Sequence, residues 1–419
     1  MAGAARGRVR LIVVDTNLLD VDMHNFNFAR GVARDGRRFG LAPRIVVPKR
    51  APASLVQALH ARAVLSFSAA DTLMQDRLSW RIAETVDGGA LLAADLAALD
   101  GSAAIADSVV LLPTASSREI LALALALERI APPRAIVMGF HSLRTGDPDR
   151  RPTNQVLGLL RYAMNRLRRV FPPERILVHA TTGLLAKDMA DLLRHQVRVC
   201  PHPIWYDLAA PVLDAEAPPP DGRTTFAVLG GNRLDKGSDM VAGIAREGVG
   251  LADRARLLVQ LLPRLREPAG TSIADALAGN PLVAIRRGVM PESAMLHHCA
   301  TADAVLLPYD PAEYRDRASG IFAMAVAMGR PVIAPAGTWM AERLQAGEAT
   351  GIVVQVHAAF AYVAAMRRFL VEPARFQAAA AQRAAPWRAR ESGLRYLEAM
   401  VRDLDRAGLW TGPQMSSSG

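Results

Sequence analysis

Cysteine and long apolar runs are scarce in this chain of 419 residues. The two cysteines, Cys200 and Cys299, have no metal-ligand spacing around them, which argues against a disulfide framework and against a zinc site. The longest apolar run, residues 120–127, is far too short to span a bilayer, and the amino terminus lacks an apolar segment of signal-peptide length. We therefore expect a cytoplasmic protein that is neither exported nor integral to a membrane.

Lysine and aromatic residues are also rare. Only three of the 50 basic residues are lysines, and aromatic residues make up 5% of the chain. The formal net charge of +10 therefore comes almost entirely from arginine, and no basic stripe interleaved with aromatics stands out. The composition argues against a nucleic-acid partner and favours anionic substrates or acidic membrane surfaces. With so few lysines, the position of Lys236 becomes more informative.

Strand and helix patterns alternate over most of the chain. Hydrophobic residues make up 51% and charged residues 21%, as in ordinary globular proteins, and the length suits two domains. The alternation predicts α/β domains with doubly wound sheets. In the first half we expect strands near residues 9–15, 44–48, 63–67, 108–113, 135–140, 175–179 and 197–201. Residues 1–210 are therefore predicted to form one Rossmann-like domain.

A second alternation follows a stretch without apolar periodicity. Residues 211–223 are rich in proline and aspartate, and we place an interdomain linker there. Residues 224–386 are predicted to form a second Rossmann-like domain, with strands near 225–229, 256–261, 282–286, 304–308, 331–335 and 351–356. Residues 387–419 are expected to comprise a helix over 387–409, which packs back on the first domain, and a frayed tail.

Residues 301–339 carry the clearest strand–loop–helix pattern. An apolar strand over 304–308 leads into a polar loop that begins at Tyr309, and Ser319-Gly320 opens a helix that Gly329 ends. Ligands bind outside the carboxyl ends of the strands in such sheets. Because the first turn of a helix leaves its N–H groups unpaired, we expect the amides of Ser319 and Gly320 to point at an anion.

The second domain opens with a similar unit, FAVLGGNRLDKG over 226–237. Gly230 and Gly231 let the backbone approach a ligand closely, and Arg233 and Lys236 stand three apart where the next helix dipole is positive. Two cations there suit a diphosphate, and they would stabilise the charge that it gains as a leaving group. A solvated helix start is the alternative interpretation. The second anion site, at Ser319-Gly320, favours the diphosphate.

Three motifs together resemble the donor domain of the retaining GT-B glycosyltransferases of family four. They are GGNRLDKG over 230–237, YRDRASG over 314–320 and AMGRPVI over 327–333, and the resemblance covers residues 224–359 well and the first domain more loosely. It implies two Rossmann-like domains that face a central cleft, a nucleotide-diphosphate-sugar as co-substrate, transfer with retention, no metal and no further cofactor. By position, Arg233 and Lys236 would contact the diphosphate.

The family also carries two acidic residues, eight positions apart, before its Gly-x-Pro-Val segment. Counting back from Gly329, the first falls on Asp316, which would touch sugar or nucleotide. The second falls on Met324, whose thioether cannot accept hydrogen bonds from a ribose as a carboxylate does. Arg317 and Tyr309 complete the expected donor-binding residues. Met324 leaves three alternatives open: weak nucleotide binding, an unusual donor, or an inactive domain.

In the first domain, His24 begins the helix after the first strand. The family often has Gly-His at about this point, in contact with the donor sugar, and here the pair is Met23-His24. A structural or solvent-exposed histidine is the alternative. The expected acceptor-binding residues follow two strands: Asn17, Asp22, Asn25 and His141. The Asp-x-Asp sequences at 20–22 and 147–149 are discounted as metal sites, because loops rich in aspartate are commonplace.

The helical pattern over 150–169 puts apolar residues on one face and arginines elsewhere. Such a helix could rest on an anionic membrane, where a lipid-linked acceptor would be, or pack on its own sheet. Together these features predict a glycosyltransferase of bacterial surface polysaccharide or lipopolysaccharide synthesis, cytoplasmic or peripheral on the membrane. The alternatives are a non-catalytic subunit that binds a nucleotide sugar or glycan, which Met324 favours, and a sugar-nucleotide epimerase.

Overall fold

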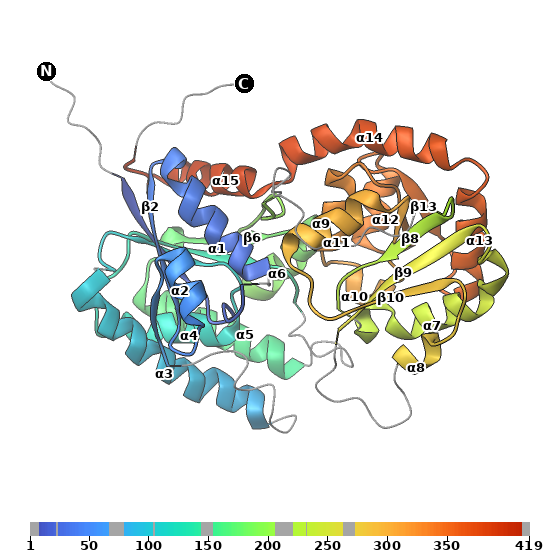
Figure 1. Ribbon diagram of the computed structural model, residues 1–419. Helices are drawn as coiled ribbons and strands as arrows, with labels where there is room; N and C mark the ends of the chain where they lie inside the picture. The colour runs from blue at the N-terminus through green and yellow to red at the C-terminus, as the bar shows by residue number, and fades with distance from the viewer. Residues whose placement is uncertain are drawn as a thin grey trace, which may run out of the picture. The chain divides into compact units, whose positions relative to one another are not determined.

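The computed structural model describes residues 8–21, 24–66, 79–103, 105–143, 154–205, 221–231, 233–262 and 273–412. The chain divides into two compact units (Figure 1). Unit 1 comprises Met1–Trp205 and Ser392–Gly419, and unit 2 comprises Tyr206–Glu391. Within the described ranges, no helix combines the length and the apolar character needed to cross a membrane. Each unit is built around one parallel sheet.

Unit 1 contains a sheet of seven parallel strands. The strands are β1 (Val9–Val14), β2 (Leu41–Pro48), β3 (Arg62–Leu65), β4 (Val109–Leu112), β5 (Ala135–Phe140), β6 (Ile176–Ala180) and β7 (Val197–Val199). Their order is β3-β2-β1-β4-β5-β6-β7, so β1 pairs with β2 on one side and β4 on the other. All residues of β4 and β5 are buried, as expected for strands covered on both faces.

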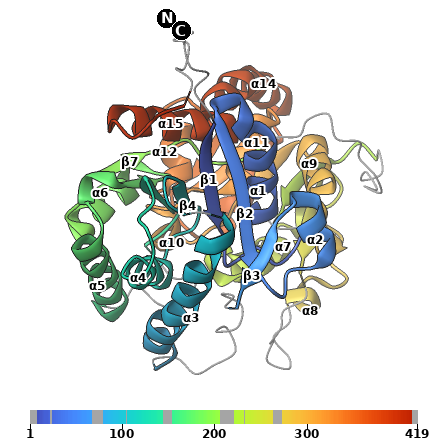
Figure 2. The same cartoon turned by 90° about the vertical axis from the view of Figure 1, so that its left-hand side faces the viewer.

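Helices cover both faces of this sheet. They are α1 (His24–Asp35), α2 (Ala53–Leu59), α3 (Ser79–Ala103), α4 (Ser117–Ala126), α5 (Asn154–Val170), α6 (Gly183–Leu193) and α15 (Gly393–Arg406). Figure 2 shows α1 and α2 on one side of β1 and β2, and α3, α4 and α5 on the other. Leu11 and Val13 of β1 accordingly share a core with α1, α2 and α15, whereas Ile12 and Val14 share one with α3 to α6.

Unit 2 contains a sheet of six parallel strands. The strands are β8 (Thr224–Val228), β9 (Ala255–Leu261), β10 (Val283–Arg287), β11 (Ala304–Leu306), β12 (Val332–Pro335) and β13 (Gly351–Val354). Their order is β10-β9-β8-β11-β12-β13, so the direction of winding reverses between β8 and β11. Ligands of such sheets bind outside the carboxyl ends of the strands at this switch point.

The helices of unit 2 form two groups. They are α7 (Ser238–Glu247), α8 (Ile273–Leu277), α9 (Glu292–Thr301), α10 (Pro311–Tyr314), α11 (Gly320–Ala327), α12 (Trp339–Gln345), α13 (Ala359–Phe369) and α14 (Pro373–Arg390). The first group, α7, α8 and α13, shares a core with β8 and β9. In the second, Phe322 of α11 packs edge to face on Trp339 of α12 and on Trp387 of α14, with ring centroids 5.3 and 5.7 Å apart.

The predicted fold class is confirmed, because both units are doubly wound α/β layers. Each predicted strand is present, with ends that differ by at most three residues. The helix predicted over 387–409 is wrong in its start and its continuity: α14 runs through Pro386 to Arg390, and Ser392 caps a separate helix, α15. The buried Trp387 anchors α14 beyond the proline. Since α15 belongs to unit 1, the predicted return of the chain is confirmed.

The apolar face of α5 packs on the sheet of unit 1. Its buried residues are Leu160, Ala163, Met164 and Leu167. Arg161 and Tyr162 are exposed on the outer face of the helix. Of the two alternatives for this segment, the structure supports packing, so the apolar face is not open to a membrane. Residues 150–153 of the predicted helix lie outside the described residues.

Candidate functional site

The carboxyl end of β8 turns through a glycine that is fixed to the neighbouring strands. Gly230 has a left-handed backbone, with φ of 93°, which glycine adopts without strain. Its N–H donates to Oε1 of Gln260 at the end of β9 (2.8 Å), and Nε2 of Gln260 donates to the carbonyl of Gly288 after β10 (3.2 Å). The buried Gln260 side chain therefore ties together the ends of three adjacent strands.

The short 3₁₀ turn η4 (Leu234–Lys236) is held against the end of β11 by its backbone. Gly237 ends the turn with φ of 71°, and a Cβ atom there would lie 1.9 Å from the carbonyl oxygen of Pro308. The N–H of Asp310 donates to the carbonyl of Asp235 (3.1 Å). Only glycine fits so close to the Pro308 carbonyl. Gly237 therefore allows the 230–237 motif to meet the loop after β11 at the switch point of the sheet.

A buried carboxylate gathers two arginines beside η4. The Asp235 side chain, 4% exposed, accepts a hydrogen bond from Nε of Arg233 (2.8 Å), pairs with its Nη2, and lies 3.2 Å from Nη1 of Arg317. The Arg317 guanidinium lies over the ring of Tyr314, 5.1 Å from its centroid. One carboxylate does not neutralise two guanidinium groups, so this cluster keeps a net positive charge.

Lys236 adds a third cation to the cluster. Its Nζ lies 5.8 Å from the centre of the Tyr309 ring, and a Cβ atom on Gly230 would lie 3.1 Å from this Nζ. Burial, together with the neighbouring charges of Arg233 and Arg317, lowers the pKa of Lys236 to about 8. The protonated amine is therefore poorly solvated and repelled by its neighbours. An anion bound at this place would relieve both effects.

The amino terminus of α11 lies beside the same glycine turn. The hydroxyl of Ser319 accepts a hydrogen bond from the N–H of Phe322 (3.2 Å) and so caps the helix. Because Ser319 is the N-cap, the first-turn amides are those of Gly320 and Ile321, one residue later than the expected pair of Ser319 and Gly320. The side chain of Ile321 would lie 3.5 Å from a Cβ atom on Gly230. The positive end of the α11 dipole is thus adjacent to the cation cluster.

Most predicted donor-site residues therefore converge on one place in unit 2. These are Gly230, Arg233, Lys236, Tyr309, Arg317, Ser319 and Gly320. Gly231 is the next residue of the same turn, and Met324 is partly buried farther along α11. Asp316 is 6% exposed, so its carboxylate offers little surface to a ligand.

The sequence interpretation missed two residues that organise the site. In the sequence, Asp235 stands between the two cations of the motif, Arg233 and Lys236. This position is the signal that could have identified it as a site residue. The carboxylate of Asp235 orients both Arg233 and Arg317. The loop over 309–318 was also expected to be irregular, but Asp310 caps the short helix α10 within it through a hydrogen bond from the N–H of Ala312 (2.8 Å).

In unit 1, the carboxyl end of β1 carries a buried carboxylate that was not predicted as a site residue. Asp15, 2% exposed, accepts hydrogen bonds from Nδ2 of Asn25 (3.0 Å) and from the N–H of Asn17 (2.9 Å). Burial raises the pKa of Asp15 to about 6, in spite of these two hydrogen bonds and with a contribution from Glu119. The side-chain amide of Asn25, on α1, is therefore engaged by Asp15.

The other predicted residues of unit 1 are placed as follows. Nε2 of His141 lies 2.9 Å from the carbonyl oxygen of Pro113, which fixes the ring across the ends of β5 and β4. His24 begins α1, but its side chain lies outside the described part of the structure, as does the whole of Asp22.

Asp15 should make the stability of unit 1 depend on pH. A carboxyl group with a pKa raised from 3.8 to about 6 costs the folded state up to about 3 kcal/mol once both states are ionised. The wild-type free energy of unfolding should therefore fall between pH 4 and pH 6, and Asp15→Asn should remove this part of the fall. Urea unfolding of both proteins across this range measures the difference. Parallel curves would show that Asp15 is not responsible.

The comparisons with known proteins point to one fold. No protein-family model and no curated protein sequence matches the chain. The structure of sucrose-phosphate synthase from Thermosynechococcus elongatus is similar, with a TM-score of 0.66 and 15% identity over 96% of this chain and 100% of that one. HepE from Anabaena, in complex with UDP-glucose, gives a TM-score of 0.63 at 12% identity over 95% and 100%.

A third similar structure is a UDP-forming α,α-trehalose-phosphate synthase from Burkholderia xenovorans. Its TM-score is 0.67 at 13% identity, over 96% of this chain and 99% of that one. The likeness spans both units and nearly all of each compared chain, so it concerns the fold as a whole. The chain thus has the GT-B fold that the sequence resemblance implied.

Proposed function

We propose that this chain is a metal-independent retaining glycosyltransferase. It moves a sugar from a nucleotide-diphosphate-sugar to a glycan or glycolipid acceptor in bacterial surface polysaccharide or lipopolysaccharide synthesis. The observation that carries the proposal is the convergence of Arg233, Lys236 and Arg317 with the amino terminus of α11. Fixed cations and open amides at one point suit a diphosphate. The binding of UDP-glucose by HepE, which has a similar fold, supports a nucleotide sugar as the ligand.

The cations act on the leaving group in this proposal. Negative charge grows on the nucleoside diphosphate as its bond to the sugar breaks, and Arg233 and Lys236 stabilise that charge. The amides of Gly320 and Ile321 add dipoles of the same sign. Since Asp235 holds Arg233 before the ligand arrives, less ordering of the guanidinium is needed on binding.

Two further roles follow from the family resemblance. His24 would orient the donor sugar. Asp316 would touch sugar or nucleotide only if its carboxylate, which is buried, becomes accessible when the donor binds. Acceptor hydroxyls would be bound by unit 1, through residues that follow its strands: Asn17, Asp22, Asn25 and His141. Among these, Asn25 reaches an acceptor only if its hydrogen bond to Asp15 is exchanged, because its side chain is buried.

A transfer assay tests the proposal. The full chain is incubated with a panel of nucleotide sugars, with and without bacterial glycan and glycolipid acceptors, and the released nucleoside diphosphate is measured. We expect slow release alone and faster release with the right acceptor, with a product of retained anomeric configuration by NMR. Binding of a nucleotide sugar without release would favour the non-catalytic alternative. Conversion of the donor without an acceptor would indicate an epimerase.

Replacing Met324 with glutamate bears directly on the non-catalytic alternative. If residue 324 faces the nucleotide ribose, Met324→Glu adds a charged acceptor for its hydroxyls. We expect about 10- to 100-fold tighter nucleotide binding, since a hydrogen bond to a charged group contributes about 1.5–3 kcal/mol. Met328→Glu, one turn farther from the start of α11, is the control and should leave the affinity unchanged. Equal affinities of Met324→Glu and wild type would contradict the ribose contact.

The pKa of Lys236 predicts a pH dependence of diphosphate binding. The amine is protonated below about pH 8 in the free protein and loses its charge above it. Affinity for a nucleoside diphosphate should therefore be highest below pH 8 and fall by up to about tenfold per pH unit above it. Titrations at pH 7 and pH 9 measure this fall. This fall in affinity should be absent in Lys236→Gln. The same fall in that variant would mean that another group is responsible for the pH dependence.

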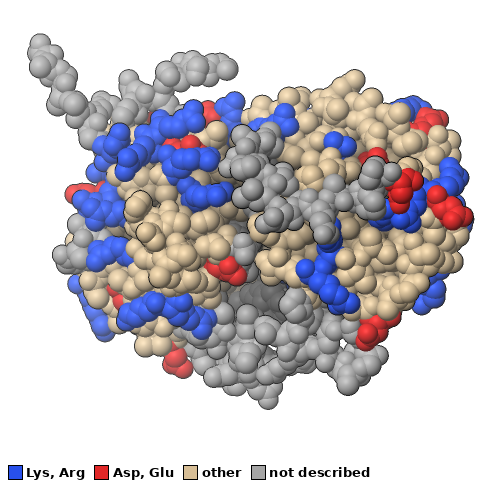
Figure 3. All heavy atoms as spheres, in the orientation of Figure 1, with Lys and Arg blue, Asp and Glu red and all other residues tan. Residues whose placement is uncertain are grey.

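A cytoplasmic location, with peripheral association on an anionic membrane, forms part of the proposal. Figure 3 shows Lys and Arg side chains over much of the described surface of unit 1 on the face drawn. Each basic side chain near an anionic surface contributes about 1 kcal/mol to association. Because the apolar face of α5 is buried, this charge is what supports membrane association.

A further inference from the structure

A histidine, a cysteine and an aspartate converge inside unit 1. His179 lies on β6, Cys200 follows β7, and Asp403 lies on α15. One ligand atom of each lies within 4.8 Å of those of the other two. The residues are 1%, 3% and 5% exposed, so bulk water does not separate them. In the described part of the chain, no other group of His, Cys, Asp and Glu side chains meets this condition.

The imidazole of His179 is poorly satisfied for a buried group. Neither ring nitrogen makes a hydrogen bond of normal geometry with a described residue, although Nε2 lies 3.2 Å from Oδ2 of Asp403. Tyr396 covers the ring edge to face, with centroids 6.1 Å apart. Buried polar nitrogens without partners are costly, and ligation of a metal is a role that uses such a nitrogen.

The two oxygens of Asp403 have different surroundings. Oδ1 pairs with Arg198 and lies 3.6 Å from Nη1 of Arg406. Oδ2 is the oxygen that approaches His179. The arginines therefore orient the carboxylate from outside and leave Oδ2 to the cluster. Metal-bound carboxylates are held by outer hydrogen bonds of this kind.

We propose that His179, Cys200 and Asp403 bind a zinc ion through Nε2, Sγ and Oδ2. Zinc takes nitrogen, sulfur and oxygen ligands at about 2.0–2.3 Å in a tetrahedron, whose ligand atoms are about 3.3–3.7 Å apart. The separation of 3.2 Å between Nε2 and Oδ2 is close to one edge of that tetrahedron. Calcium and magnesium prefer sites made of oxygen alone, and the Cys200 sulfur disfavours them.

The charges of this site balance. Cys200 releases its thiol proton to solvent as the sulfur–zinc bond forms, so its thiolate and the Asp403 carboxylate together neutralise the two charges of the ion. His179 binds as the neutral imidazole. No oxidant or other reactant is required, and the arginines on Oδ1 stay outside the ligand shell.

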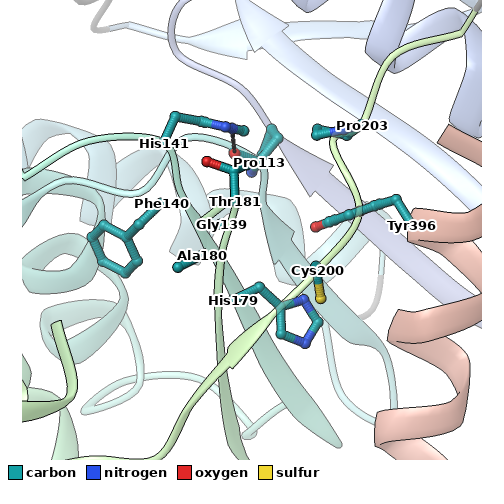
Figure 4. A pocket seen from close by; sticks show the side chains of 10 residues that line it. All are labelled: Pro113, Gly139, Phe140, His141, His179, Ala180, Thr181, Cys200, Pro203 and Tyr396. Carbon is teal, nitrogen blue, oxygen red and sulfur yellow. Dashed lines mark hydrogen bonds between the residues drawn. The ribbon is translucent and has the colours of Figure 1, made fainter. Parts of the chain in front are cut away.

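A small crevice beside the cluster supplies the fourth position. It is lined by His179, Cys200 and Tyr396 and by residues after β5 and β6, among them His141 and Thr181 (Figure 4). Figure 4 shows the Cys200 sulfur beside the His179 ring. The crevice has room for about one water molecule, which suits the open coordination position of zinc. An ion here would fasten α15 to the edge of the sheet in unit 1.

Cobalt spectroscopy tests the site. The full chain, without an affinity tag and stripped by a chelator, is titrated with Co²⁺, which takes the same tetrahedral ligands as zinc. We expect one equivalent to produce visible tetrahedral bands and a thiolate-to-cobalt band in the near ultraviolet, both lost on adding Zn²⁺. Cys200→Ser should lose the thiolate band. Cys299→Ser, which changes the other buried cysteine of the chain, should keep it.

A second variant keeps the test decisive if Cys200→Ser does not fold. Asp403→Asn has the same shape and removes one ligand charge, and its zinc affinity should fall at least about tenfold, since even outer-shell changes cost that much. Zn²⁺ should also raise the melting temperature of wild type more than that of Asp403→Asn. The proposal is overturned if wild type shows no thiolate band, if that band survives Cys200→Ser, or if Asp403→Asn binds zinc as tightly as wild type. The cluster would then be a metal-free histidine–aspartate contact.

Discussion

Replacing Lys236 with alanine is expected to slow sugar transfer by about 10²–10³-fold. This corresponds to about 2.7–4 kcal/mol of transition-state stabilisation, as for the loss of one preorganised group at a developing negative charge. Lys236 is half-buried, and its Nζ lies close to Gly230 and to the charges of Arg233 and Arg317, where its own charge is poorly screened by water. The measurement is kcat/KM for nucleoside diphosphate release in the presence of the acceptor.

Lys187 provides the matched control for this loss. It is exposed on α6 and is one of only three lysines in the chain. Lys187→Ala should leave kcat/KM within a factor of about two, because exposed charges far from a site contribute little. Turnover by Lys236→Ala equal to that of Lys187→Ala would remove Lys236 from the donor site.

Replacing Gly237 with alanine should both destabilise unit 2 and abolish donor binding. The left-handed backbone at this residue costs a non-glycine residue about 1–2 kcal/mol. In addition, the new Cβ atom would lie 1.9 Å from the Pro308 carbonyl oxygen, so the turn η4 must move away from β11. Overpacking of this kind adds about 1–3 kcal/mol. We expect a total loss of about 2–5 kcal/mol in urea unfolding, together with loss of nucleotide affinity.

Gly347 separates the two contributions. It has nearly the same backbone, with φ of 70°, but a Cβ atom there would meet nothing within 4 Å. Gly347→Ala should therefore cost only the backbone strain, about 1–2 kcal/mol, and leave nucleotide affinity unchanged. Equal losses of stability in the two variants would mean that η4 does not depend on close contact with Pro308.

The strands could be predicted from the sequence because each is a short apolar run between polar or turn residues. A fully buried parallel strand such as β5 is a continuous apolar run, so its position in the sequence is easy to predict. The break between α14 and α15 was placed wrongly, because proline at 386 is a strong stop signal by itself. The helix continues past it since Trp387 packs on Phe322 and Trp339, which are distant in the sequence. Such packing cannot be derived from local pattern.

The residues of the candidate sites also differ in whether local sequence is enough to predict them. Arg233 and Lys236 share one short motif with the glycines that position them, so their convergence could be predicted. Asp235 could not be distinguished from a surface aspartate without the approach of Arg317 from another loop. Cys200 and Cys299 lack metal-ligand spacing in the sequence, and for this reason the sequence predicts no zinc site. His179, Cys200 and Asp403 come together only when three separate elements pack. Asp15 likewise lies near Glu119 of α4, a residue that is distant in the sequence.

Binding of a diphosphate by the cation cluster of unit 2 is the central claim. Calorimetric titration of the full chain with nucleoside diphosphates and their monophosphates, in wild type and Lys236→Gln, tests it most directly. We predict that wild type binds at least one nucleoside diphosphate more tightly than its monophosphate, and that Lys236→Gln removes at least about tenfold of that affinity. Diphosphate binding that is no tighter than monophosphate binding, or that is unchanged in Lys236→Gln, would contradict it.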